Sequence, residues 1–139
     1  MFPSLNETPD IMSNYSIFIV DDDPQMVELM SSWLMAEGHN VASDTAGSTA
    51  LPQIALQKPD AVLVDLMMAQ VNGLELVGEL RSRPESKDTA VVMVSARTDG
   101  LWADRALDAG ADGFIHKPLK REEFVLKVCE FIEAKKAVV

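Results

Sequence analysis

Short runs of apolar residues alternate along most of the chain with segments in which apolar residues recur every three or four positions. The runs lack a polar residue at every second position, which is typical of strands that are covered on both faces. Strands that alternate with helices in this way favour an α/β fold, a doubly wound five-stranded parallel sheet with right-handed crossovers and five helices. The five strands are predicted at residues 16–20, 40–43, 61–64, 90–94 and 113–115.

The segments between the strands have the period of helices. Asp23 and Pro24 predict the N-cap and the first residue of one helix, and Gly38 ends it. Four more helices are predicted at residues 49–57 with Ser48 as the cap, at 74–81, at 101–109 and at 121–135. The inner stripes are expected at Met26, Leu29, Met30 and Trp33 of the first helix and at Phe124, Val128 and Phe131 of the last. Apolar residues expected off these stripes are Val27, Leu34, Met35, Val125, Cys129 and Ile132.

A chain of 139 residues with 47% hydrophobic residues can build one core of ordinary size. Residues 1–14 contain two prolines and no periodic pattern, so we expect a flexible leader there. The folded domain is predicted at residues 15–136, followed by a tail at 137–139.

The net charge of −10 is unevenly distributed. Ten acids and one base precede or include Asp65, and 12 acids and 11 bases follow it, which gives −9 and then −1. Nucleic acids and anionic membranes are bound by clustered Lys and Arg, so we expect neither as a direct partner. The apolar runs are far shorter than the ~20 residues of a membrane helix. The single Cys129 cannot form an internal disulfide, and a cytoplasmic location is expected.

Polar residues follow the predicted strands at the end where ligands bind in sheets of this kind. Three aspartates at 21–23 follow the first strand, Asp65 the third, Ser95 the fourth and Lys117 the fifth. Asp23 is expected to be a helix cap only. Carboxylates that converge on one site repel one another unless a cation joins them, and Mg²⁺ is the natural oxygen-ligated ion. A hydroxyl and an ammonium beside a metal-bound carboxylate form a receptor for a phosphoryl group.

Four separated motifs, IFIVDDDP, AVLVDLMMAQVNGLEL, VVMVSA and GADGFIHKP, resemble those of the response-regulator receiver domain of two-component signalling. The resemblance covers about residues 16–134, and the gaps of 30 and 22 residues between Asp65, Ser95 and Lys117 match the family. It implies a flavodoxin-like receiver fold that transmits a signal by accepting a phosphoryl group.

The resemblance also implies a role for each matching residue. Asp65 would be the phosphoacceptor and, with Asp21, Asp22 and the backbone carbonyl of Met67, would bind Mg²⁺. Ser95 and Lys117 would contact phosphoryl oxygens, and Lys117 would precede a cis peptide bond to Pro118. Ser95 and Phe114 would form a conformational switch, although Phe114 is equally consistent with a core aromatic.

The family further implies a sensor histidine kinase or a histidine phosphotransfer protein as the phosphoryl donor. It also implies pairing with a second copy or an effector through the fourth and fifth helices. Such a domain catalyses its own phosphorylation and dephosphorylation and is not otherwise an enzyme. Met67 and Arg97 lie two residues beyond Asp65 and Ser95, where they would shield the site from water and slow dephosphorylation. Ala69 stands where the family usually has proline.

Two alternatives remain open at this point. One is a metal-dependent phosphohydrolase with Asp65 as the nucleophile, although Met67 stands where such an enzyme has its second acid. The other is a degenerate domain that serves only in dimerisation, although every expected site residue is present.

Overall fold

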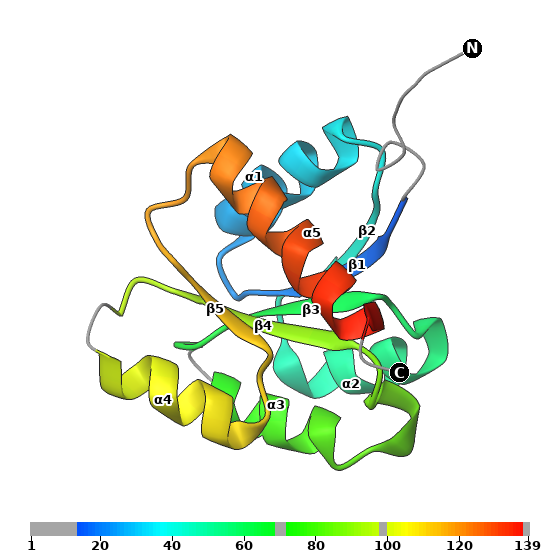
Figure 1. Cartoon of the computed structure of the whole chain (residues 1–139), viewed down its shortest axis with the longest axis vertical. Helices are drawn as coiled ribbons and strands as arrows, with labels where there is room; N and C mark the ends of the chain where they lie inside the picture. Colours follow the sequence, from blue (N-terminus) through cyan, green and yellow to red (C-terminus); the bar gives the residue numbers. More distant parts are fainter. Residues whose placement is uncertain (1–13, 69–71, 98–99, 138–139) are drawn as a thin grey trace.

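The computed structural model describes residues 14–68, 72–97 and 100–137 of the chain. Five parallel strands form one sheet in the order β2-β1-β3-β4-β5, with helices on both faces (Figure 1). The predicted α/β fold is confirmed. The strands are β1 (Ser16–Val20), β2 (Asn40–Asp44), β3 (Ala61–Asp65), β4 (Ala90–Ser95) and β5 (Gly113–His116). The helices are α1 (Pro24–Ala36), α2 (Gly47–Gln57), α3 (Gly73–Arg81), the short 3₁₀ helix η2 (Pro84–Ser86), α4 (Gly100–Ala109) and α5 (Arg121–Ala137).

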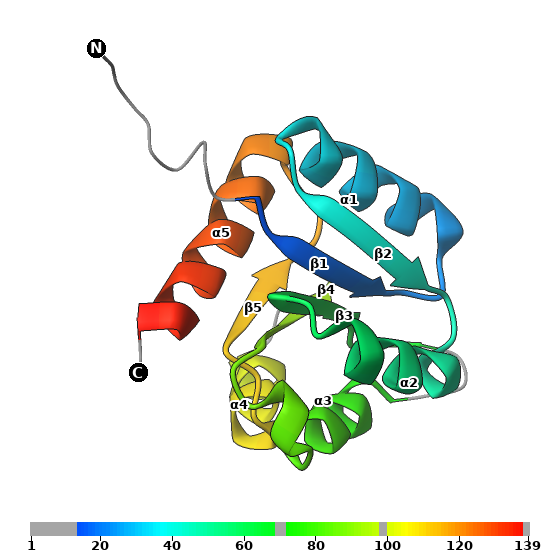
Figure 2. The same ribbon diagram turned by 90° about the vertical axis from the view of Figure 1, so that its right-hand side faces the viewer.

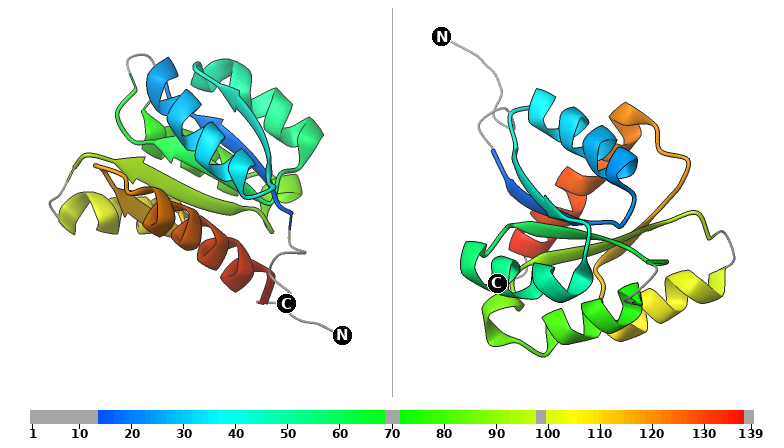
Figure 3. Two further views of the ribbon diagram at one scale, coloured as in Figure 1. Left: turned by 90° about the horizontal axis from the view of Figure 1, so that it is seen from above. Right: turned by 180° about the vertical axis from the view of Figure 1, so that it is seen from behind.

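Two apolar layers cover the sheet. Helices α1 and α5 pack on one face, and α2, α3 and α4 pack on the other (Figure 2). The right-hand view in Figure 3 shows the sheet between these layers from behind. Strands β3 and β4 are buried at every position, because they lie in the middle of the sheet and are covered on both faces. No helix in the described ranges is long and apolar enough to cross a membrane.

Four strands end one residue later than the sequence pattern predicts. The additional residues are polar and lie at the carboxyl end of the sheet, and two of them are the predicted site residues Asp65 and Ser95. Each is still paired with a neighbouring strand, Asp65 with Val94 and Ser95 with His116. The backbone under both site residues is therefore fixed by the sheet.

The predicted inner faces of α1 and α5 are partly wrong. The sequence pattern predicts Leu34 off the stripe of α1 and Leu29 on it, but Leu34 is fully buried and Leu29 is 38% exposed. In α5, Ile132 takes the fully buried position expected of Phe131, which is only half-buried. The core residues of both helices follow i, i+4 spacing, Met30 and Leu34 in α1 and Phe124, Val128 and Ile132 in α5. This row of side chains lies on one edge of the predicted stripe, because each helix meets both the sheet and its neighbour.

The predicted helix starts are partly right. The side chain of Asp23 accepts a hydrogen bond from the backbone N–H of Gln25 at 3.0 Å and caps α1 as expected. Ser48 does not cap α2, which starts at Gly47 after Ala46 and has no side-chain cap. The helix is held instead by Asp44 of β2, whose carboxylate accepts a hydrogen bond from the hydroxyl of Thr49 at 2.5 Å.

The end of α5 overlaps the predicted tail, since the helix continues to Ala137. Residue 14 of the predicted leader is described, and residues 1–13 lie outside the described ranges. Val138, Val139 and Ala69 also lie outside them.

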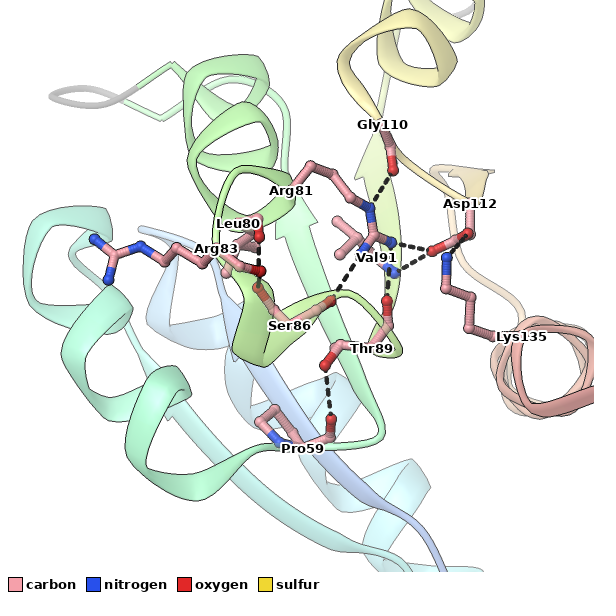
Figure 4. A network of polar contacts seen from close by, with 10 residues as sticks. All are labelled: Pro59, Leu80, Arg81, Arg83, Ser86, Thr89, Val91, Gly110, Asp112 and Lys135. Atoms are coloured by element: carbon pink, nitrogen blue, oxygen red, sulfur yellow. Dashed lines mark hydrogen bonds and ion pairs between the residues drawn. The ribbon is translucent and has the colours of Figure 1, made fainter. Parts of the chain in front are cut away.

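A polar network joins the elements at the amino end of the sheet (Figure 4). Arg81, at the end of α3, donates to the backbone carbonyls of Gly110, Ser86 and Thr89 at 2.7, 2.9 and 2.8 Å and also pairs with Asp112. The carboxylate of Asp112 accepts further bonds from the backbone N–H of Val91 at 2.8 Å and from Lys135 at 3.0 Å. The network fixes one end of the sheet, opposite the edge that carries the predicted site.

Candidate phosphoryl-transfer and metal site

The three predicted carboxylates come together at the carboxyl end of the sheet. Asp21 and Asp22 follow β1, Asp65 ends β3, and oxygen atoms of the three side chains lie within 4.8 Å of one another. Asp21 is 1% exposed and Asp65 is 9% exposed, whereas Asp22 is exposed to solvent. The turn after β1 is held in place because one carboxylate oxygen of Asp21 accepts a hydrogen bond from the backbone N–H of Asp23 at 2.9 Å. Asp23 itself remains a helix cap, as the sequence predicts.

Lys117 reaches this cluster from the end of β5. Its Nζ atom lies 3.4 Å from Oδ2 of Asp21 and 3.8 Å from Oδ1 of Asp65. The peptide bond between Lys117 and Pro118 is cis, as the resemblance implied. The backbone N–H of Lys117 donates to the carbonyl of Ser95 at 2.8 Å, which anchors this segment to β4. At these distances, the ammonium group of Lys117 faces Asp21 and Asp65, two of the three acids.

Asp65 differs from an ordinary carboxyl group in its pKa. Burial and the neighbouring carboxylate of Asp21 raise its pKa from 3.8 to about 6, against the opposing effects of Lys117 and the backbone N–H of Met67. The N–H of Met67 lies 3.4 Å from Oδ1 of Asp65. The carboxylates of the site thus carry more negative charge than the ammonium group of Lys117 stabilises.

The donor set fits a divalent cation. Three carboxylates carry a formal charge of −3 and Lys117 carries +1, which leaves −2 for a bound ion to balance. Carboxylate oxygens are the ligands that Mg²⁺ prefers, and the exposed Asp22 leaves one side of the cluster open to water. The raised pKa of Asp65 supports the same assignment, because a bound cation would counter the two effects that raise it, burial of the charge and repulsion by Asp21.

Ser95 and Phe114 lie on the neighbouring strands β4 and β5. Ser95 is 1% exposed, and its hydroxyl oxygen accepts the backbone N–H of Arg97 at 3.1 Å. Phe114 is half-buried against the core between the sheet and helices α2–α4, and its ring centroid lies 4.8 Å from that of His116. Phe114 is therefore neither a fully buried core residue nor a free surface group.

Gly73 also lies against the site, although the sequence predicts no role for it there. Its backbone passes so close to Asp65 that a Cβ atom there would lie 2.4 Å from the carbonyl oxygen of Asp65. The preceding Asn72 caps α3 and forms an isolated antiparallel bridge with Met67. A glycine directly after a capping asparagine was the available signal, but the close approach itself depends on the tertiary fold.

Residues 17–129 match the family model described as the response regulator receiver domain. The DNA-binding response regulator MtrA of Mycolicibacterium smegmatis is 37% identical over 112 residues, which are 81% of this chain and 48% of that protein. The transcriptional regulatory protein KdpE of Mycobacterium tuberculosis is 33% identical with the same coverage. The chain thus spans about half the length of the curated relatives that it matches.

Solved structures share the fold. A CheY-like response regulator receiver domain protein from Methanospirillum hungatei superposes with a TM-score of 0.82 at 24% identity, over 90% of this chain and 98% of that one. The strand order and the distribution of helices described above therefore recur in a domain of nearly the same extent.

The relatives contradict one expectation from the sequence. The net negative charge predicts that nucleic acid is not a partner, but MtrA is named as a DNA-binding response regulator. The prediction was wrong because the match covers 48% of MtrA, and the charge of that part does not determine what the rest of MtrA binds.

The family match extends over most of the described chain and includes the residues that form the acidic cluster, its lysine and its hydroxyl. The five-stranded parallel sheet and its helices agree with that match. The chain belongs to the response regulator receiver domain family.

Proposed function

We propose that Asp65 accepts a phosphoryl group from the phosphohistidine of a sensor kinase or of a histidine phosphotransfer protein, with Mg²⁺ bound at the acidic cluster. The observation that carries the proposal is the convergence of Asp21, Asp22 and Asp65, within 4.8 Å of one another, with Lys117 against two of them. Phosphoryl transfer needs an in-line nucleophile and fixed positive charge and little other covalent machinery.

In the proposed reaction, a carboxylate oxygen of Asp65 attacks the phosphorus atom and the bond from phosphorus to the imidazole nitrogen breaks. The imidazole keeps the bonding electron pair, and Asp65 becomes an acyl phosphate. Because the pKa of Asp65 is about 6, the side chain is mostly ionised at neutral pH. Mg²⁺ would be held by Asp21, Asp22, Asp65 and the backbone carbonyl of Met67. The bound ion would neutralise charge on the transferred group.

The remaining site residues have distinct roles in the proposal. Lys117 donates to one phosphoryl oxygen from its position 3.8 Å from Asp65. The hydroxyl of Ser95 donates to another after the group has been transferred, and the half-buried ring of Phe114 moves with it. That coupled movement would change the surface near α4 and β5 and so transmit the signal.

The protein acts, in this proposal, as a phosphoacceptor and not as a multiple-turnover enzyme. Met67 follows two residues after Asp65 and is 55% exposed, so a thioether and not a second acid stands beside the acceptor. Together with Arg97, it would restrict the access of water to the acyl phosphate and slow its hydrolysis. A cytoplasmic location is part of the proposal, since the lone Cys129 suits a reducing compartment.

The test is incubation of the whole chain with Mg²⁺ and acetyl phosphate, followed by intact-mass spectrometry. The proposal predicts a stable gain of one phosphoryl mass that requires Mg²⁺ and is lost in Asp65→Asn. Continuous release of phosphate over many turnovers would support a phosphohydrolase instead. Absence of any reaction in the folded protein would support a degenerate domain.

A further inference from the structure

The indole ring of Trp102, in the first turn of α4, contacts two arginines. The guanidinium carbon of Arg97 lies 5.0 Å from the ring centroid, and that of Arg105 lies 5.1 Å from it. Both distances are within the range of a cation–π interaction. Trp102 is half-buried and packs against the core beneath α4, so the ring is fixed by contacts that do not involve the arginines.

Arg97 connects this ring to the candidate site. Its backbone N–H donates to the hydroxyl oxygen of Ser95, which is buried at the end of β4. One residue therefore holds the Ser95 hydroxyl with its backbone while its side chain is held by Trp102. Arg105 differs, because it contacts the same ring from within α4 and has no recorded contact with Ser95 among the described residues.

We propose that Trp102 is a positioning residue: through its contact with Arg97 it stabilises the resting position of the Ser95 hydroxyl and so opposes binding of a phosphoryl group at Asp65. This inference rests on the proposed function, in which Ser95 turns to donate to a phosphoryl oxygen. The backbone that follows Ser95 has to adjust in that step, and the Arg97 side chain anchors it.

The expected size of the effect follows from the exposure of the pair. Arg97 is exposed, and an exposed cation–π contact contributes about 0.5–1 kcal/mol. A contact that is made only in the resting state stabilises that state. It therefore lowers the affinity of a ligand that binds the other state by the corresponding factor. Removing the contact should therefore tighten the binding of a phosphoryl mimic by roughly two- to five-fold.

The experiment measures the dissociation constant of beryllofluoride, a mimic of the bound phosphoryl group, with Mg²⁺ and the whole chain, followed by NMR. Trp102→Leu is expected to bind roughly two- to five-fold more tightly than the wild type. Trp102→Phe keeps an aromatic face and should return toward the wild-type value. Arg105→Gln is the matched control, since it removes a cation from the same ring, and should leave the affinity unchanged.

A double-mutant cycle separates positioning from loss of packing. Arg97→Gln should tighten binding as much as Trp102→Leu does, and combining the two should add nothing further. If the wild type binds the mimic and Trp102→Leu binds it equally or more weakly, this inference is overturned and the proposed function is not. Absence of binding by the folded wild type overturns the proposed function and this inference with it.

Discussion

A Cβ atom on Gly73 would lie 2.4 Å from the backbone carbonyl oxygen of Asp65 and 2.8 Å from the Cα atom of Leu66. The first residue of α3 thus packs directly against the backbone of the proposed phosphoacceptor. The backbone N–H of Gly73 also donates to the carbonyl of Leu66 at 3.1 Å. The start of α3 and the end of β3 form one unit, in which the side chain at residue 73 has no room.

Gly73→Ala is therefore expected to lower the free energy of unfolding by about 1–3 kcal/mol and to slow phosphorylation of Asp65, because the added methyl group displaces the acceptor backbone. Urea denaturation and the rate of mass gain with acetyl phosphate check the two effects. Gly78→Ala is the matched control in the same helix, since its Cβ would have no neighbour within 4 Å. It should stabilise the protein by about 0.5–1 kcal/mol, and a similar gain in Gly73→Ala would contradict the account.

Asp65→Asn should stabilise the metal-free protein at neutral pH. The pKa of Asp65 in the folded state, about 6, lies above the ordinary value of 3.8. Stability from the protonated form is therefore fully present below about pH 4 and is lost as the pH rises through 6, by up to about 3 kcal/mol. The asparagine variant lacks this loss.

The measurement is urea denaturation of both proteins in a metal chelator, at about pH 4 and about pH 7.5. The advantage of Asp65→Asn should grow between these two conditions and shrink again when Mg²⁺ is added at the higher pH, since the ion stabilises the ionised wild type. A constant difference between the two proteins at both pH values would show that the carboxyl group is not destabilised by its neighbours.

Lys117→Met should raise the pKa of Asp65 further above about 6, because the ammonium that favours the ionised carboxylate is removed. Phosphorylation by acetyl phosphate should slow by on the order of tenfold or more, since a donor to the transferred group is lost. A ¹³C NMR titration of the Asp65 carboxyl group and the rate of mass gain test the two parts. Lys120→Met, at an exposed position three residues further along the chain, should change neither. An unaltered Asp65 titration in Lys117→Met would contradict the geometry.

The network at the opposite end of the sheet should matter for stability and not for chemistry. Arg81→Met removes the hydrogen bonds to three backbone carbonyls and the ion pair with Asp112, and should lower the free energy of unfolding by about 2–4 kcal/mol. Arg83→Met removes an exposed pair with Glu85 at 4.0 Å and should change stability by less than about 0.5 kcal/mol. If Arg81→Met abolished phosphorylation while remaining folded, the separation of the two ends would be wrong.

The sequence predicted the parts of this structure that depend on local pattern. Apolar runs located all five strands, and the polar residues that follow them, such as Asp65 and Lys117, converge because parallel strands place their carboxyl ends at one edge. The faces of α1 and α5 were predicted less well, because two neighbouring surfaces decide whether Leu34 or Leu29 is buried. The role of Gly73 could not be predicted, because its close approach to Asp65 is a tertiary contact that the local Asn72-Gly73 pattern does not reveal.

The central claim is that the side chain of Asp65 becomes an acyl phosphate, and reductive trapping tests it at the level of the residue. Borohydride converts an aspartyl phosphate to homoserine, which peptide mass spectrometry locates in the digested protein. After incubation with Mg²⁺ and acetyl phosphate, the account predicts homoserine at position 65 and none at positions 21 and 22. Homoserine at either of those positions, or at no position in a folded protein, would contradict it.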